Sequence, residues 1–115
     1  MSRVTVEDVE ELLDAFEKVA THCGDWVDSY GTPSPRIRNT LLRALTVASN
    51  GVRRGRAMLQ DGDALIHVIE ETKGGASDVA HIMSSGPQYV RDLYLGIEAL
   101  GYVMWRRCQE CGAEQ

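Results

Sequence analysis

An apolar stripe over residues 6–30 constrains the fold of this chain more than any other feature. Apolar side chains recur there at steps of three and four residues, which places them on one face of a helix for about seven turns. Thr5, just before the stripe, and Asp8, in its first turn, have the spacing of a capping box, with Asp in place of the usual Glu. The sequence therefore predicts a long amphipathic helix whose apolar face is Val6, Val9, Leu13, Phe16, Ala20, Cys23, Val27 and Tyr30.

A second amphipathic segment follows a Gly-Thr-Pro break at residues 31–33. Ser34 is suited to cap its N-terminus, and Pro35 is suited to its first helical position. Asn50-Gly51 in its middle leaves two interpretations open, a weak point within one long helix or a genuine turn. The apolar face of the segment is Ile37, Leu41, Leu45, Ala48, Val52 and Leu59.

Residues 63–83 are predicted to form two short helices rather than one long helix. Asp63 is suited to cap the first, and the Gly-Gly pair at 74–75 is expected to end it. A second short piece then runs as far as Met83.

The last helix opens at Gly86-Pro87 and is apolar on two faces. We expect one face to dock on the rest of the chain and the other, with Arg106 at its edge, to contact a partner protein. The alternative is a central helix with neighbours on every side. The docking face is Val90, Leu93, Ile97, Leu100 and Met104, and the partner face is Leu95, Ala99, Tyr102 and Trp105.

Together these segments predict an all-α fold, a compact bundle of four to five helices. Two long terminal helices accompany a long central basic helix. The 115 residues fit one helical domain, residues 1–115, with 108–115 as a flexible tail. Hydrophobic residues make up 43% of the chain, which is enough for a buried core. The expected core is Leu13, Phe16, Leu41, Leu45, Ala48, Leu93, Ile97 and Leu100.

Charge is segregated along the chain, whose net charge is −5. Residues 1–30 contain eight acids, whereas residues 31–60 contain six arginines and no acid. We expect the acidic and basic helices to lie side by side in one fold.

The alternative interpretation of the basic segment is a DNA-binding helix-turn-helix. Gly51 would form the turn, and Arg53, Arg54 and Arg56 would begin a recognition helix that contacts bases and phosphates. Gly55 weakens such a recognition helix, and the acidic remainder of the chain opposes DNA binding. Nucleic acid is therefore not the favoured partner.

Cys108 and Cys111, followed by Gly112, have the spacing of half a zinc site. A tetrahedral site needs two further ligands, which a second copy of the chain would supply in a symmetric dimer. The alternatives are a frayed tail with two incidental thiols and a redox pair, which lacks here the strand and helix that normally support such chemistry. The remaining candidate ligands stand at no standard metal-binding spacing: His22, Cys23, His67 and His81.

The sequence carries no recognisable catalytic motif, because no nucleophile stands at a known spacing from a histidine and no nucleotide-binding loop is present. We therefore expect a non-enzymatic protein-binding module without a cofactor, acting as a regulator, an inhibitor or an assembly subunit. Its partner is another protein or a second copy in a homodimer. A DNA-binding regulator and a zinc-stabilised adaptor are the alternatives. No segment resembles a signal peptide or a membrane span, so a cytoplasmic location is expected.

Overall fold

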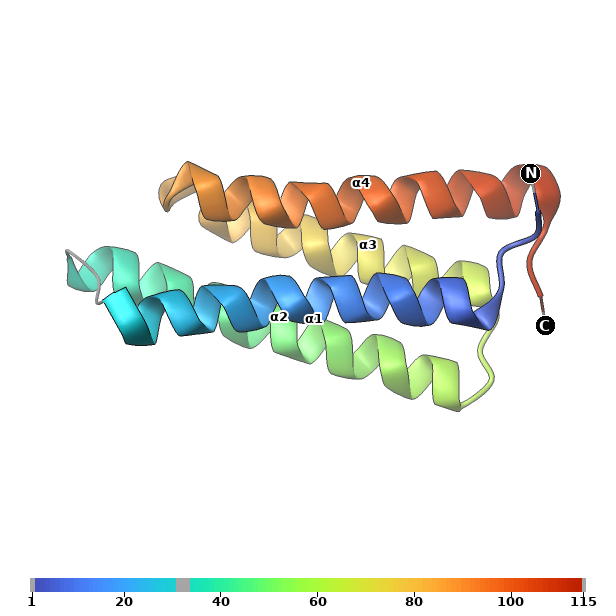
Figure 1. The fold of residues 1–115 in the computed structure, drawn as a ribbon, viewed down its shortest axis with the longest axis horizontal. Coiled ribbons are helices and arrows are strands. Elements are labelled where there is room, and N and C mark those ends of the chain that lie inside the picture. Colours follow the sequence, from blue (N-terminus) through green and yellow to red (C-terminus); the bar gives the residue numbers. More distant parts are fainter. Residues whose placement is uncertain (1, 31–33, 115) are drawn as a thin grey trace.

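The computed structural model describes residues 2–30 and 34–114, and this part of the chain contains four long helices (Figure 1). Consecutive helices run in opposite directions and form an elongated bundle. The predicted all-α bundle, with two long terminal helices and a long basic helix between them, is confirmed. The helices are α1 (Val6–Tyr30), α2 (Pro35–Gln60), α3 (Leu65–Ile82) and α4 (Gln88–Cys111), with a short 3-10 helix, η1 (Met83–Ser85), before α4.

Both predicted caps of the first two helices are present. The backbone N–H of Thr5 donates to the Asp8 carboxylate at 2.9 Å, and the N–H of Asp8 donates to Oγ1 of Thr5 at 3.2 Å. Ser34 accepts a hydrogen bond from the N–H of Ile37 at 3.2 Å, and Pro35 occupies the first turn of α2. These bonds satisfy donors that a helix N-terminus leaves without partners. The break predicted at residues 31–33 and the side chain of Tyr30 lie outside the described residues.

Of the two interpretations left open at Asn50-Gly51, the structure has the long helix, because α2 is continuous there. The helix end predicted at residues 74–75 is wrong, because α3 is continuous through them. The proposed cap at Asp63 is also wrong, since Ala64 occupies the cap position without a side-chain hydrogen bond. A Cβ added at Gly75 would lie 3.9 Å from Cα of Gly51. The glycines therefore let α2 and α3 approach closely, and this packing offsets their low helix propensity.

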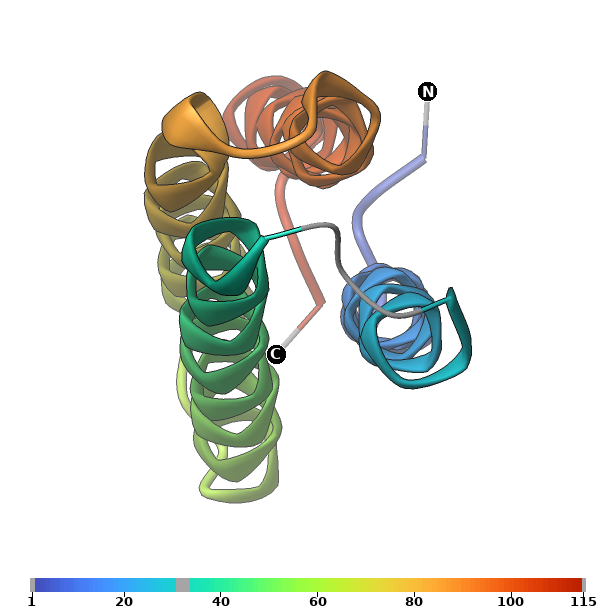
Figure 2. The same cartoon turned by 90° about the vertical axis from the view of Figure 1, so that its left-hand side faces the viewer.

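The core fills the space between the four helices, which occupy successive corners of the bundle when it is viewed end-on (Figure 2). Phe16 lies at its centre and packs edge-on against Tyr94, with ring centroids 6.2 Å apart. The expected core residues that are buried are Leu13, Phe16, Leu41, Ala48 and Ile97.

The predicted docking face of α4 is partly wrong. Leu100 is 53% exposed, and Leu93 on α4 and Leu45 on α2 are only partly buried. A Cβ at Gly101 would lie 3.1 Å from Cβ of Lys73, so Gly101 marks the close approach of α4 to α3. Because of this contact, the side of α4 that faces the core is only in part the heptad-like stripe that was predicted to dock. Val90 and Ile97 are buried as predicted, and the other buried residues of α4 are Tyr94, Gly101 and Cys108.

The two ends of the described chain pair with each other at one end of the bundle (Figure 1). The N–H of Val4 donates to the carbonyl of Gly112 at 3.1 Å, and the N–H of Glu114 donates to the carbonyl of Val4 at 2.8 Å. Arg107 donates to the carbonyls of Ser2 and Arg3 at 3.0 and 3.1 Å. Residues 108–114, expected as a flexible tail, instead complete α4 and form this pairing, which we call the terminal clasp.

Candidate functional site

The surface of α4 that points away from the bundle carries the largest group of exposed apolar side chains described. Leu100, Tyr102 and Val103 are 53%, 48% and 64% exposed. We call this surface the outward face of α4 and define it by the exposed residues on adjoining turns of this side of the helix. They are Asp92, Gly96, Ala99, Leu100, Tyr102, Val103 and Arg106.

The predicted partner residues fall into two groups in the structure. Ala99, Tyr102 and Arg106 are exposed on the outward face. Leu95 and Trp105 are instead partly buried against the core. Trp105 stacks on Tyr102, with centroids 6.1 Å apart, and Nζ of Lys73 lies 6.0 Å from the Trp105 ring. The Trp105 indole therefore packs against the exposed Tyr102 ring from the core side and is not itself part of the outward face.

Val103 is the residue of this surface that the sequence prediction missed, and Leu100 is the one that it assigned to the core. Val103 stands four residues after Ala99 and seven after Gly96, so it shares a helical face with both. That spacing was a usable signal. The spacing was not recognised because apolar residues occur around most of the circumference of this helix, so no single face stands out.

A groove of about 330 Å³ separates the outward face of α4 from α1. Its apolar lining is Leu12 and Ala15 from α1, with Leu100, Val103 and Met104 from α4. The two helices are neighbours in the end-on view, on the side where the N-terminal segment passes (Figure 2). The groove extends the exposed apolar surface of α4 across to α1.

Charged groups border this groove where it meets the terminal clasp. Arg107 donates to the Asp8 carboxylate at 2.6 Å, and both side chains are about a quarter exposed. The pKa of Asp8 lies below its ordinary value, first because the backbone N–H of Thr5 donates to the carboxylate, and further because the Thr5 hydroxyl and Arg107 contact it. Asp8 is thus held ionised at neutral pH as part of the cap of α1.

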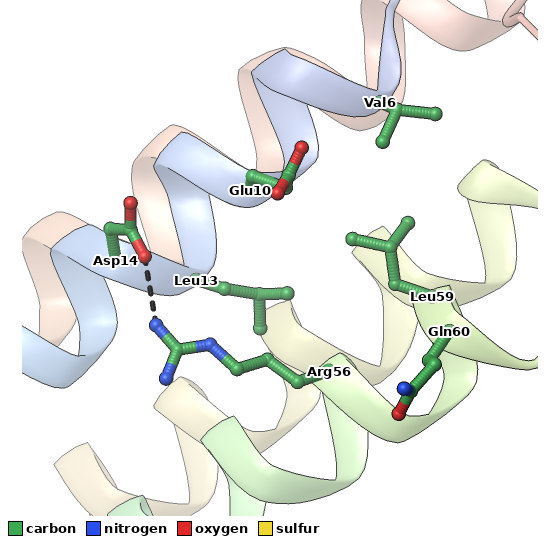
Figure 3. Close-up of a pocket in the computed structure, with 7 residues that line it drawn as sticks. All are labelled: Val6, Glu10, Leu13, Asp14, Arg56, Leu59 and Gln60. Atoms are coloured by element: carbon green, nitrogen blue, oxygen red, sulfur yellow. Dashed lines mark hydrogen bonds and ion pairs between the residues drawn. The ribbon is translucent and has the colours of Figure 1, made fainter.

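Two arginines of α2, Arg54 and Arg56, bind acids of neighbouring helices. The contact of Arg56 with α1 agrees with the predicted pairing of the acidic and basic helices. Arg56 donates to Asp14 at 2.8 Å (Figure 3). It also donates to Glu17 at 2.9 and 3.1 Å, and both contacts tie α2 to α1. Arg54 donates to Glu71 of α3 at 2.5 Å. The hydrogen bonds that Arg56 donates, first to Glu17 and then to Asp14, raise the pKa of Arg56.

Because α2 has no turn at Gly51, the helix-turn-helix interpretation of this segment is wrong. Arg53 is exposed, and within the described residues it makes no ion pair. Arg54 and Arg56 already use their guanidinium groups on carboxylates. The basic segment is one face of a continuous helix that pairs with acidic neighbours.

Two recesses flank Arg56 between α1 and α2. The first, of about 350 Å³, is drawn in Figure 3 and has Val6, Leu13 and Leu59 as its apolar lining. The second, of about 470 Å³, lies on the other side of Arg56 and reaches Ala20 and Val52. The bridge from Arg56 to Asp14 and Glu17 thus divides one shallow interhelical groove, and its charged groups bind one another.

The cysteine pair lies at the end of α4, with Cys108 buried and Cys111 partly exposed. Burial raises the pKa of the Cys108 thiol. His22 and Cys23 lie about 24 Å along α1 from its start, far from the clasp to which α4 returns. Across residues 2–30 and 34–114, no three His, Cys, Asp or Glu side chains gather as a metal site. The described residues therefore do not bring the two further ligands of a tetrahedral zinc site to these thiols.

No family model, no curated protein and no solved structure matches this chain. Within the described residues, none of the helices combines the length and the apolar character that a bilayer span requires.

Proposed function

We propose that this chain is a non-enzymatic protein-binding module that acts through the outward face of α4, and that its partner is a second copy of the chain. The observation that carries the proposal is the exposure of Leu100, Tyr102 and Val103 on adjoining turns of one helix. Contiguous apolar patches of this kind usually mark interaction surfaces on a folded protein.

The energetics of the exposed side chains favour association. Fully burying a Val or Leu side chain contributes about 1.5–3 kcal/mol, so covering the exposed parts of Leu100 and Val103 contributes about 1 kcal/mol or more for each. Tyr102 adds a flat ring that is already ordered by its stacking on Trp105, so little rotamer freedom is lost on binding. Arg106, paired with Glu110 at 3.0 Å, supplies a polar rim.

Solution mass, measured by light scattering and by sedimentation between micromolar and millimolar protein, tests this proposal. The unmodified chain should form a dimer as concentration rises, and Val103→Glu should yield a folded monomer with unchanged circular dichroism. Leu42→Glu is the matched control, because Leu42 is an exposed leucine on α2, away from the outward face. A chain that stays monomeric throughout, or a dimer that Val103→Glu leaves intact, overturns the proposal.

Two alternative functions have direct tests. A gel shift with duplex DNA across a range of salt tests DNA binding, and we expect no complex near physiological salt because acids lie beside Arg54 and Arg56 and the net charge of −5 repels phosphates. Metal analysis of protein prepared with zinc and reductant tests the adaptor function of Cys108 and Cys111. A cytoplasmic location belongs to our proposal, since free thiols are typical of a reducing compartment.

A further inference from the structure

The outward face of α4 carries opposite charges on the two sides of a small residue. Asp92, Ala99 and Arg106 follow one another at steps of seven residues, so they share one line along the helix. Each charge lies about 10 Å along the axis from Ala99, in opposite directions. Asp92 and Arg106 are both exposed, and Asp92 forms no ion pair with any described residue.

We infer that two copies of the chain pair through α4 in antiparallel orientation, with the two-fold axis at Ala99. This inference rests on the proposed function and fixes its geometry. In a two-fold arrangement, a residue contacts the partner residue that lies equally far on the other side of the axis. Asp92 then faces the partner's Arg106, and Arg106 faces the partner's Asp92. The small side chain of Ala99 at the axis lets the two helix backbones approach closely.

The same register matches shape as well as charge. A Cβ added at Gly96 would meet no atom within 4 Å, so the surface is open there. Val103 is the most exposed apolar side chain of the face, and it lies on the same side of the line through Ala99 as Gly96 does. Antiparallel pairing about Ala99 places Val103 over the partner's Gly96. The midpoint between these two positions lies only half a residue from Ala99, so the same two-fold axis relates them. An exposed side chain thus meets an open site in the register that pairs the charges.

Parallel pairing of α4 is disfavoured by the same charges. It would place Asp92 against the partner's Asp92 and Arg106 against the partner's Arg106, and facing like charges repel. The bond from Arg106 to Glu110 within one chain does not prevent the antiparallel pair, because an exposed i,i+4 ion pair is weak and readily exchanged. Only the antiparallel order brings each exposed charge of this line against its opposite.

A charge-exchange cycle followed by sedimentation tests the register. Asp92→Arg and Arg106→Asp should each weaken the dimer by about tenfold or more, because each places like charges together. The double variant should recover to within about threefold of the unmodified chain. Arg91→Asp is the matched control, since Arg91 is an exposed charge next to Asp92 but on another side of α4, and it should leave the dimer unchanged.

Cross-linking provides a second readout of the same geometry. In a Cys111→Ser background, Ala99→Cys should form a disulfide-linked dimer under mild oxidation, because the axis brings both copies of this position together. Gly96→Cys lies on the same face but away from the axis, and it should cross-link at least about tenfold more slowly. Faster cross-linking through Gly96→Cys, or a dimer whose charge variants show no coupling, overturns the register and leaves the proposed function standing. A monomeric unmodified chain overturns both.

Discussion

Replacing Gly55 with alanine tests the close packing of α1, α2 and α3. Alanine in a helix interior ordinarily stabilises the helix by about 1 kcal/mol relative to glycine. At Gly55 the added Cβ would lie 2.5 Å from Cδ2 of Leu13 and 3.1 Å from Oγ1 of Thr72. Both neighbours are buried, so neither can move aside without disturbing others. Forcing an extra carbon into such a site costs about 1–3 kcal/mol, which opposes the gain in helix propensity.

Gly74 of α3 is the matched control, because a Cβ added there meets no atom within 4 Å. Gly74→Ala should therefore raise the free energy of unfolding by about 0.5–1 kcal/mol. Both positions lie inside helices, so both substitutions share the gain in propensity. The difference between the variants isolates the steric cost, and Gly55→Ala should be about 1–3 kcal/mol less stable than Gly74→Ala.

Urea denaturation followed by circular dichroism measures both free energies of unfolding. The dependence of that free energy on urea concentration should be the same for the two variants, so that their midpoints can be compared directly. If Gly55→Ala proves as stable as Gly74→Ala, then α2 does not approach Leu13 and Thr72 as closely as described, and the steric argument is refuted.

Three further predictions concern single side chains. The Tyr94 hydroxyl is buried, and among the described residues the group beside it is the Cys23 thiol, a weak hydrogen-bonding group, so Tyr94→Phe should raise the free energy of unfolding by about 1 kcal/mol in urea denaturation, and a loss would contradict this. Because Asp8 has a lowered pKa when folded, its stabilising contribution is present above its unfolded pKa and is lost as pH falls through the folded pKa. Unfolding midpoints of Asp8→Asn should therefore fall less steeply with pH below about 4 than those of the unmodified chain. Cys111 should react with a thiol reagent well before the two buried cysteines, and equal rates measured by mass spectrometry would be inconsistent with their burial.

Features set by neighbours in the chain could be predicted from the sequence. The capping pair Thr5 and Asp8, and Ser34 with Pro35, act within one helical turn, so their spacing was sufficient. The apolar stripe of α1 has a single face, and most of its predicted members are buried, although the buried Leu12 was missed and Val6 is only partly buried. The pairing of Arg56 with α1 followed from the separation of acidic and basic segments.

Features set by tertiary contact could not be predicted in the same way. Glycine disfavours a helix when considered alone, and only the contact between α2 and α3 explains why Gly51 and Gly75 lie within helices. The orientation of α4 depended on Gly101 approaching Lys73 and on Tyr94 reaching Phe16. A helix with apolar residues on most sides does not reveal which of them dock, so Leu100 was assigned to the core although it is exposed.

Because the terminal clasp brings the two ends of the described chain together, the same bundle could form from a chain in which the helices come in a different order. Val4 and Ala113 are paired in parallel, so a short linker that reverses direction and runs back along the pair would join the ends. New ends could be opened at Gly62, which is exposed in the turn between α2 and α3. A circularly permuted chain of this kind would begin with α3 and end with α2, and each helix would keep its neighbours. The bundle is a closed ring of helices in which none is intrinsically the first.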